Sequence, residues 1–133
     1  MDSGIYSLII RLTKDQEIKI GKLGKMKFKR GFYIYTGSAL NGLKARIERH
    51  RKKQKKKFWH IDYLLASKHA KMCQVITIKT NKKLECRLSK IVSSLAGAEP
   101  VKRFGCSDCK CKSHLSYFEE SSLVKFLKNV KLR

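Results

Sequence analysis

Three runs with the composition of β-strands fall within the first 36 residues, ahead of any segment with a helical pattern. Residues 5–12 and 16–23 are rich in β-branched and other apolar residues, and a short polar turn separates them. This arrangement predicts an antiparallel hairpin. Residues 31–36 predict a third strand, and the polar residues 24–30 before it predict a loop. The sequence therefore predicts an α+β fold in which a central three-stranded antiparallel sheet is flanked by helices.

The next segment has the pattern of an amphipathic helix. Residues 40–51 carry Leu40, Leu43 and Ile47 at three- and four-residue spacing, and Asn41 or Ser38 is expected to cap the helix. Composition and periodicity also predict helices at 59–66, 84–95 and 121–130, a strand at 74–79, a basic loop at 52–57 and a Cys-rich loop at 104–115. A chain of 133 residues without an internal repeat is expected to form one domain, residues 1–133.

The charge balance restricts the classes of partner. Lysine and arginine number 32 against 10 acidic residues, which gives a formal net charge of +22. Nucleic acid is the usual partner of such a protein, because each neutralised phosphate releases condensed counterions. An anionic membrane surface and an adaptation to heat are the competing explanations. The sequence has no apolar run long enough to span a membrane and no signal-peptide pattern, so we expect a cytoplasmic protein without a membrane partner.

Two short motifs in the predicted strands, followed by two residues on the next helix, form an ordered series. The first strand carries Gly4-Ile5-Tyr6 and the third carries Tyr35-Thr36-Gly37; Arg46 and His50 then follow four residues apart. In this series the chain resembles the GIY-YIG nuclease superfamily, and over nearly its whole length it is similar to a branch of small stand-alone proteins. It departs from most relatives in the threonine of the second motif and in a longer gap between the motifs. The longer gap fits an elongated hairpin over residues 16–30.

The resemblance implies a metal-dependent endonuclease that hydrolyses DNA phosphodiester bonds. It assigns Mg²⁺ or Mn²⁺ to Glu85, proton abstraction from water to Tyr6 or Tyr35, stabilisation of the phosphorane to Arg46, and positioning or proton transfer to His50. One carboxylate is sufficient for Mg²⁺, which keeps several waters and also binds the substrate phosphate. A tyrosine with a pKa near 10 needs a nearby cation to act as a base. Each of these residues also has a purely structural explanation. Glu85 would be a favourable charge near a helix N-terminus. The tyrosines would be ordinary aromatic residues of the sheet, and Arg46 and His50 would lie on a solvated face of their helix.

Five further residues are expected to bind the substrate. Gly37 lets the backbone come close to a phosphate or clears a tight turn, and Ser38 follows it. In some relatives a histidine after the arginine-bearing helix joins the site, and His60 has that place in this chain. The alternative is that His60 is a histidine at a packing interface. Lys52 and Lys53 belong to the basic run and would contact the phosphate backbone, of DNA more than of RNA. The oligomeric state does not follow from the sequence.

The cysteines favour a metal or reduced thiols over a disulfide framework, because there are five of them. Cys106, Cys109, Cys111 and His114 offer four ligands suited to Zn²⁺. The similar branch makes Cys86 an alternate ligand in place of Cys106. Buried thiols remain an equal alternative to structural zinc.

A second function class is compatible with the same residues. A non-catalytic basic protein could bind nucleic acid on this scaffold and would also bind DNA in a salt-sensitive manner. The joint presence of Tyr6, Arg46 and Glu85 favours the enzyme, because a pure binding protein has no need of a carboxylate facing phosphate.

Overall fold

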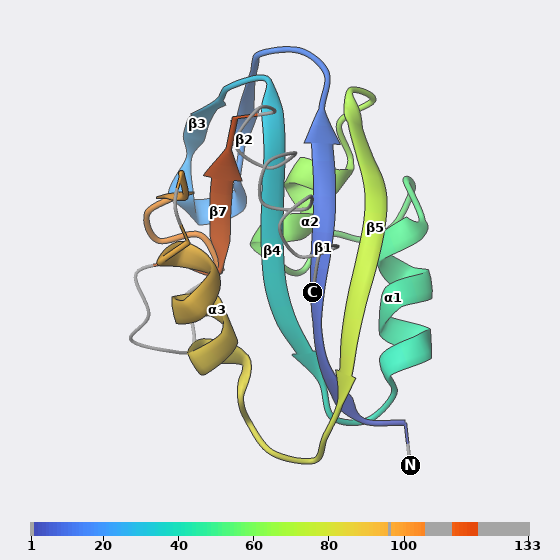
Figure 1. The fold of residues 1–133 in the computed structure, drawn as a ribbon. Helices are drawn as coiled ribbons and strands as arrows, with labels where there is room; N and C mark the ends of the chain where they lie inside the picture. Colours follow the sequence, from blue (N-terminus) through green and yellow to red (C-terminus); the bar gives the residue numbers. More distant parts are fainter. Residues whose placement is uncertain (1, 96, 106–112, 120–133) are drawn as a thin grey trace.

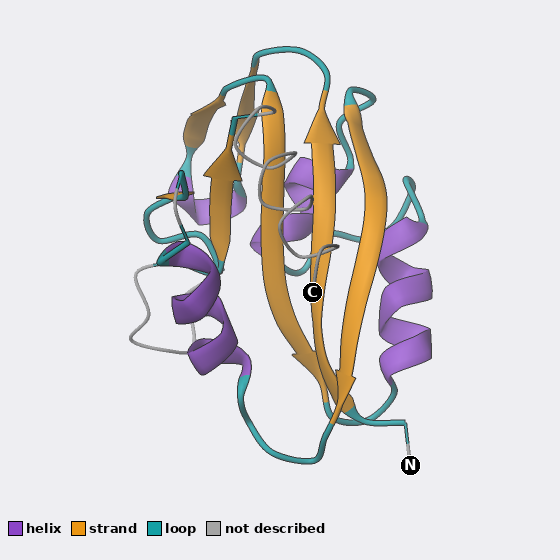
Figure 2. Ribbon diagram, in the orientation of Figure 1, coloured by secondary structure: helices purple, strands orange, loops and turns teal. Residues whose placement is uncertain are grey.

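The computed structural model describes residues 2–95, 97–105 and 113–119 (Figure 1). The first half of the chain contains the elements β1 (Gly4–Leu12), β2 (Gln16–Lys19), the 3-10 turn η1 (Gly21–Leu23), β3 (Lys25–Phe28), β4 (Gly31–Ala39) and α1 (Leu43–Arg51). The second half contains α2 (His60–Leu65), β5 (Ala70–Lys79), α3 (Glu85–Ser93), β6 (Glu99–Pro100) and β7 (Leu115–Phe118). The described part of the chain is thus mostly antiparallel sheet with three α-helices (Figure 2).

The main sheet has five strands in the order β5-β1-β4-β7-β6, and a second sheet contains β2 and β3 alone. Strand β1 pairs along its whole length with β4 on one side and with β5 on the other. The predicted central three-stranded sheet is therefore wrong. Residues 16–23 do not fold back onto β1, which leaves that edge of β1 to the ten-residue strand β5.

The second sheet also corrects the loop predicted at 24–30. Strand β3 pairs with β2 from Gln16↔Phe28 to Lys19↔Lys25. In β3, Met26 and Phe28 alternate with lysines, and Phe28 is buried in the core. This two-residue period is that of a strand with one apolar face. The strand predicted at 16–23 ends at Lys19, because η1 follows after Ile20.

The two faces of the main sheet carry different cores. Side chains of β1 alternate, so that Tyr6 and Leu8 face α1 and α2, whereas Ile9 packs with Ile34 and with Val92 of α3. Helices α1 and α2 accordingly cover one face, and α3 covers part of the other (Figure 1).

The helix predicted at 40–51 begins later than expected and has a different cap. Gly42 is the N-cap residue, and no side chain within the helix start caps it, so Asn41 and Ser38 do not have that role. Instead, Asp2 accepts hydrogen bonds from the backbone N–H groups of Leu43 (2.7 Å, to the Asp2 carbonyl) and Lys44 (2.9 Å, to Oδ2). Asp2 thus satisfies two of the free N–H donors at the start of α1.

The remaining predicted helices and strand agree in type with the structure where it describes them, whereas Leu115, predicted at the end of the Cys-rich loop, begins β7. The helices at 59–66 and 84–95 correspond to α2 and α3, and the strand at 74–79 is the second half of β5. The helix predicted at 121–130 and most of the Cys-rich loop lie outside the described residues. Among the helices that are described, none is long and apolar enough to cross a bilayer.

Candidate functional site

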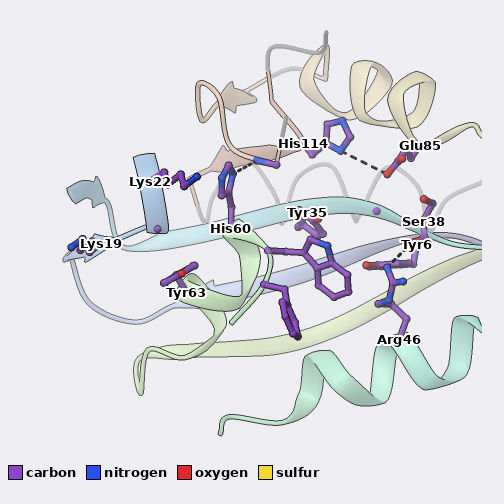
Figure 3. Close-up of a pocket in the computed structure, with 15 residues that line it drawn as sticks. Tyr6, Lys19, Lys22, Tyr35, Ser38, Arg46, His60, Tyr63, Glu85 and His114 are labelled. Atoms are coloured by element: carbon purple, nitrogen blue, oxygen red, sulfur yellow. Dashed lines mark hydrogen bonds and ion pairs between the residues drawn. The ribbon is translucent and has the colours of Figure 1, made fainter. Parts of the chain in front are cut away.

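A cleft of about 780 Å³ opens at the sheet face that α1 and α2 cover (Figure 3). Two strands of the main sheet (β1 and β4), the three described helices, the β2–η1 segment and adjoining loops all contribute residues to its lining. Its lining consists of Tyr6, Lys19, Gly21, Lys22, Tyr35, Gly37, Ser38, Arg46, Phe58, Trp59, His60, Tyr63, Glu85, Gly105 and His114. The cleft therefore contains the predicted Tyr6, Tyr35, Gly37, Ser38, Arg46, His60 and Glu85, and also His114.

Tyr6 is fixed by its neighbours across the sheet and from α1. It lies opposite Gly37 in the β1–β4 pairing, and its ring occupies the space that a side chain at position 37 would need. The Tyr6 hydroxyl oxygen lies 2.7 Å from Nε2 of His50, and both residues are buried. Burial raises the pKa of Tyr6 to about 12, although the charge of Arg46 and its hydrogen bonding act in the opposite direction.

His50 lies behind Tyr6 and is neutral at physiological pH. Burial lowers its pKa to about 4, and the nearby charges of Lys55, Arg46 and Arg49 contribute to this shift against the opposing effect of Asp62. Its Nδ1 atom is buried and has no hydrogen-bond partner among the described residues. An unpaired N–H is costlier to bury than an unpaired acceptor, so the favoured tautomer carries the proton on Nε2 and donates it to Tyr6. The Tyr6 hydroxyl proton is then free to point toward the cleft.

Arg46 is held beside Tyr6 by two contacts. Its Nη1 donates to the backbone carbonyl of Ser38 at 2.9 Å, which connects α1 to the end of β4. Its guanidinium carbon lies 4.4 Å from the centre of the Trp59 ring, and that of Arg49 lies at the same distance. Such cation–π contacts fix the direction of the guanidinium while leaving its other N–H groups available.

A buried ion pair joins the helix that carries Arg46 to the segment that carries Trp59. Arg49 donates to both carboxylate oxygens of Asp62, at 2.8 and 2.9 Å, and Asp62 is fully buried. Asp62 also accepts the backbone N–H groups of Phe58 and Trp59 at 2.9 and 3.0 Å. Burial opposes ionisation of Asp62, but these hydrogen bonds outweigh it and lower the pKa. Asp62 is thus a structural anion that holds α1 and α2 together.

Glu85 reaches the cleft at an open edge of β4. The β4–β7 pairing ends at Tyr35↔Leu115, so β7 does not cover the edge at Gly37 and Ser38, and Glu85 at the start of α3 lies there (Figure 3). Its side chain is 34% exposed, and its Oε2 lies 3.9 Å from Nδ1 of His114. In the part of the cleft lining that is described, Glu85 is the only carboxylate.

The two further tyrosines of β4 have different surroundings. Tyr35 lines the cleft but is buried, and burial raises its pKa well above the usual range. Tyr33 shares its face of the strand yet lies outside the cleft lining, where its hydroxyl donates to the Lys29 carbonyl at 2.7 Å. Tyr6 is also buried, but among these three tyrosines it is the one whose hydroxyl pairs with His50 and has Arg46 as a hydrogen-bonding neighbour.

The predicted lysine contacts are not part of the cleft. Lys53 directs its ammonium group at the carbonyls of Leu65, Ser67 and Ala70, at 2.8, 2.8 and 2.6 Å. These bonds use its three hydrogens and cap the end of α2. Lys52 follows α1 and is exposed. Neither lysine lines the cleft, whereas His60 does and also accepts the Gly105 N–H on its Nδ1 at 2.8 Å.

The predicted zinc ligands are only partly described. Cys106, Cys109 and Cys111 lie outside the described residues. His114 lies between two side chains of α3, with its Nε2 3.7 Å from the Cys86 sulfur and its Nδ1 facing Glu85. Within the described residues, no cluster of three or more His, Cys, Asp or Glu side chains is arranged to hold a metal ion.

Several cleft residues were not predicted from the sequence. Lys19, Lys22 and Tyr63 line the cleft because the β2–η1 segment packs against α2. Nothing in the local pattern indicates this packing. Asp62 had a visible signal, because it follows Trp59 by three residues, the spacing at which an acidic side chain caps a helix start.

Fold and site together define a basic protein of mostly antiparallel sheet, in which a tyrosine, an arginine and a glutamate from separate elements meet in one cleft. The chain belongs to the family described as domain of unknown function DUF123, whose model matches residues 5–132. Neither the curated proteins nor the solved structures contain a match to it.

Proposed function

We propose that this protein is a divalent-metal-dependent DNA endonuclease of the GIY-YIG type that acts in the cytoplasm. One observation carries the proposal: Tyr6, Arg46 and Glu85, from β1, α1 and α3, line the same cleft. The resemblance assigns catalytic roles to these three residues, and their positions in the sequence do not require them to meet. The net charge of +22 supports a polyanionic substrate.

The described cleft fits a Mg²⁺ or Mn²⁺ ion held by Glu85. A partly exposed carboxylate at the open edge of β4 suits a hard cation that needs only one or two protein carboxylates. When bound, the ion supplies charge neutralisation at the scissile phosphate and a lower pKa for a bound water. A tight all-protein cage is not expected, since Glu85 is the only carboxylate in the described lining.

Arg46 is suited to stabilising negative charge on the phosphorus centre. The contacts to Ser38 and Trp59 fix its position before substrate binds. Pre-positioned donors of this kind stabilise the charge that develops in the transition state without reorganising. Arg46 keeps further N–H groups for the phosphate oxygens.

The pair of Tyr6 and His50 favours one of the two roles considered for the histidine. A phenol pKa of about 12 and an imidazole pKa of about 4 make proton transfer from Tyr6 to His50 unfavourable. We therefore assign His50 to positioning of Tyr6. Without a metal ion, Tyr6 keeps its proton at neutral pH and is suited to a hydrogen bond with the attacking water or a phosphate oxygen. A cation held by Glu85 in the same cleft would stabilise the Tyr6 phenolate and lower this pKa.

The test is cleavage of linear, nicked, branched and single-stranded DNA in Mg²⁺ or Mn²⁺, with EDTA as the metal-free reference. We compare the wild type with Glu85→Gln and with Glu48→Gln, whose exposed carboxylate lies on α1 outside the cleft lining. The wild type and Glu48→Gln are expected to cut, whereas Glu85→Gln binds DNA and cuts at least about 100-fold more slowly. If the wild type binds every DNA and cuts none, the protein is a non-catalytic binder. If Glu85→Gln cuts like the wild type, the assignment of the metal ligand is wrong.

A further inference from the structure

We propose that the end of the cleft formed by β2 and η1 binds a second phosphate of the same nucleic-acid strand, so that the substrate is an oligonucleotide laid along the cleft. The inference rests on the proposed function for the identity of the ligand, a nucleic-acid strand. It assigns strand binding to Lys19 and Lys22, which lie in the segment that lengthens the gap between the two strand motifs.

The cleft has two separate ends. Tyr6, Arg46 and Glu85 lie at one end, and Lys19 and Lys22 lie at the other (Figure 3). Because the two groups lie apart in Figure 3, we assign a separate phosphate to each. A volume of about 780 Å³ is in the range of clefts that enclose a whole small molecule, which exceeds what one phosphodiester group fills.

The charge at the β2–η1 end is not neutralised within the described residues. Lys19 and Lys22 are exposed, and their ammonium groups have neither a hydrogen bond nor an ion pair in the described part of the chain. The one carboxylate of the described lining, Glu85, lies at the opposite end (Figure 3). The two ends therefore differ in chemistry: one has a carboxylate for a metal ion, and the other has only cations for an anion.

The wall that carries the two lysines is held firmly against the rest of the protein. Ile20, between them, is fully buried, and Phe28 of the paired strand is 2% exposed. Gly21 has a φ of +48°, and a Cβ atom there would lie 3.3 Å from the Tyr63 hydroxyl, so η1 packs closely on α2. The backbone of Lys19 and Lys22 is thus fixed, which lowers the entropic cost of ordering their side chains on a phosphate.

Aromatic side chains line the path between the two ends. His60 and Tyr63 lie between the lysines and the Arg46 end (Figure 3). Phe58 also lines the cleft and is 66% exposed, so its ring is accessible to a base. Rings beside a cationic track are the combination that binds unpaired strands, because every base has a face that can stack. We therefore expect a single-stranded segment in the cleft.

The experiment measures binding in EDTA, where no cutting occurs. Unlabelled dT2 and dT12 compete with a fluorescein-labelled dT12, and fluorescence anisotropy is followed at several salt concentrations. The test variant is Lys19→Ala/Lys22→Ala. The matched control is Lys68→Ala/Lys71→Ala, which removes two exposed lysines that do not line the cleft. Both variants lower the net charge by the same amount.

The test variant is expected to bind dT12 about 10-fold more weakly and to lose about 0.7 from the slope of log affinity against log salt, as expected when one phosphate of a single strand is no longer neutralised. The control variant should change dT12 affinity less than about two-fold. Affinity for dT2, which has one phosphodiester, should be nearly the same in the test variant and the wild type. Equal losses of dT12 affinity in the two variants would overturn the inference. The inference would also be overturned if the ratio of dT12 affinity to dT2 affinity were the same in the test variant as in the wild type.

These outcomes are separate from those of the cleavage test. A wild type that cuts DNA, combined with a Lys19→Ala/Lys22→Ala variant that binds dT12 normally, overturns the second phosphate site and leaves the nuclease intact. A wild type that binds dT12 through both ends but never cuts any DNA retains the strand site and overturns the nuclease.

Discussion

Gly37 of β4 lies directly across from Tyr6 of β1, and a Cβ atom at position 37 would come within 2.7 Å of the Tyr6 hydroxyl oxygen. The glycine of the second strand motif therefore makes room for the tyrosine of the first. Gly37 lies within a regular strand and has no positive φ, so the requirement is one of space rather than of backbone conformation. The role of close approach to a phosphate, expected from the sequence, stays a prediction.

Replacing Gly37 with alanine is expected to destabilise the protein by about 1–3 kcal/mol, because the new methyl group would overlap the Tyr6 hydroxyl group. The ring of Tyr6 must move, which also disturbs its hydrogen bond to His50. The free energy of unfolding in urea measures the first effect. Ser38→Ala is the control, since it changes the next residue in the strand without adding volume, and its cost should be under about 0.5 kcal/mol. Similar stabilities for the two variants would refute the steric role of Gly37.

The stability of the protein should fall as the pH decreases from about 6.5 to about 4. His50 has a pKa of about 4 in the folded protein, lowered from 6.5, so in this window the unfolded chain takes up a proton that the folded protein does not. The contribution lost is about 3 kcal/mol at most. Urea unfolding across this pH range should show a shallower dependence for His50→Gln. Tyr6→Phe keeps His50 buried and should retain the wild-type dependence; identical pH profiles for the wild type and His50→Gln would contradict the prediction.

Lys53 and Lys52 are adjacent lysines with different expected roles. Lys53→Ala removes three hydrogen bonds to the end of α2 and should destabilise the protein by about 1–2 kcal/mol, since the site is partly open to solvent. Lys52→Ala removes an exposed side chain and should have little effect on stability. The melting temperatures of the two variants in thermal unfolding measure this difference in stability. The affinity for DNA should fall by a similar small amount in both variants. Equal melting temperatures would show that the bonds of Lys53 do not stabilise the end of α2.

The sequence predicted elements better than it predicted their pairing. The strands at 5–12 and 31–36 and the helix at 40–51 have strong apolar patterns, and the structure has elements of these types there. The partner of each strand depends on contacts far apart in the chain. Strand β5 joins β1 across some 60 residues of sequence, and the turn after β1 sends β2 away to pair with β3. No local pattern distinguishes these pairings from the simpler hairpin.

The residues of the candidate site likewise divide into those that the sequence indicates and those that depend on packing. Tyr6 and Arg46 were predicted through an ordered motif series and Glu85 through the family resemblance, and the three residues line one cleft. Lys53 was predicted as a substrate contact from its place in a basic run, but composition cannot show that carbonyls already bind its ammonium group. The lysines at 19 and 22 were missed for the converse reason, because the position of their wall depends on how η1 packs against α2.

The elements that carry Tyr6 and Glu85 are attached to the rest of the protein to different degrees, which has a consequence for partly opened states. Strand β1 is hydrogen-bonded on both sides, so Tyr6 belongs to the part of the protein that opens last. Helix α3 packs on the sheet through a small cluster that includes Val92, while Ile91 on the same helix is 55% exposed. Local release of α3 would carry Glu85 out of the cleft and leave the sheet intact. Mild heating would then remove the carboxylate of Glu85 from the cleft while the circular dichroism spectrum of the strands remained that of the native protein.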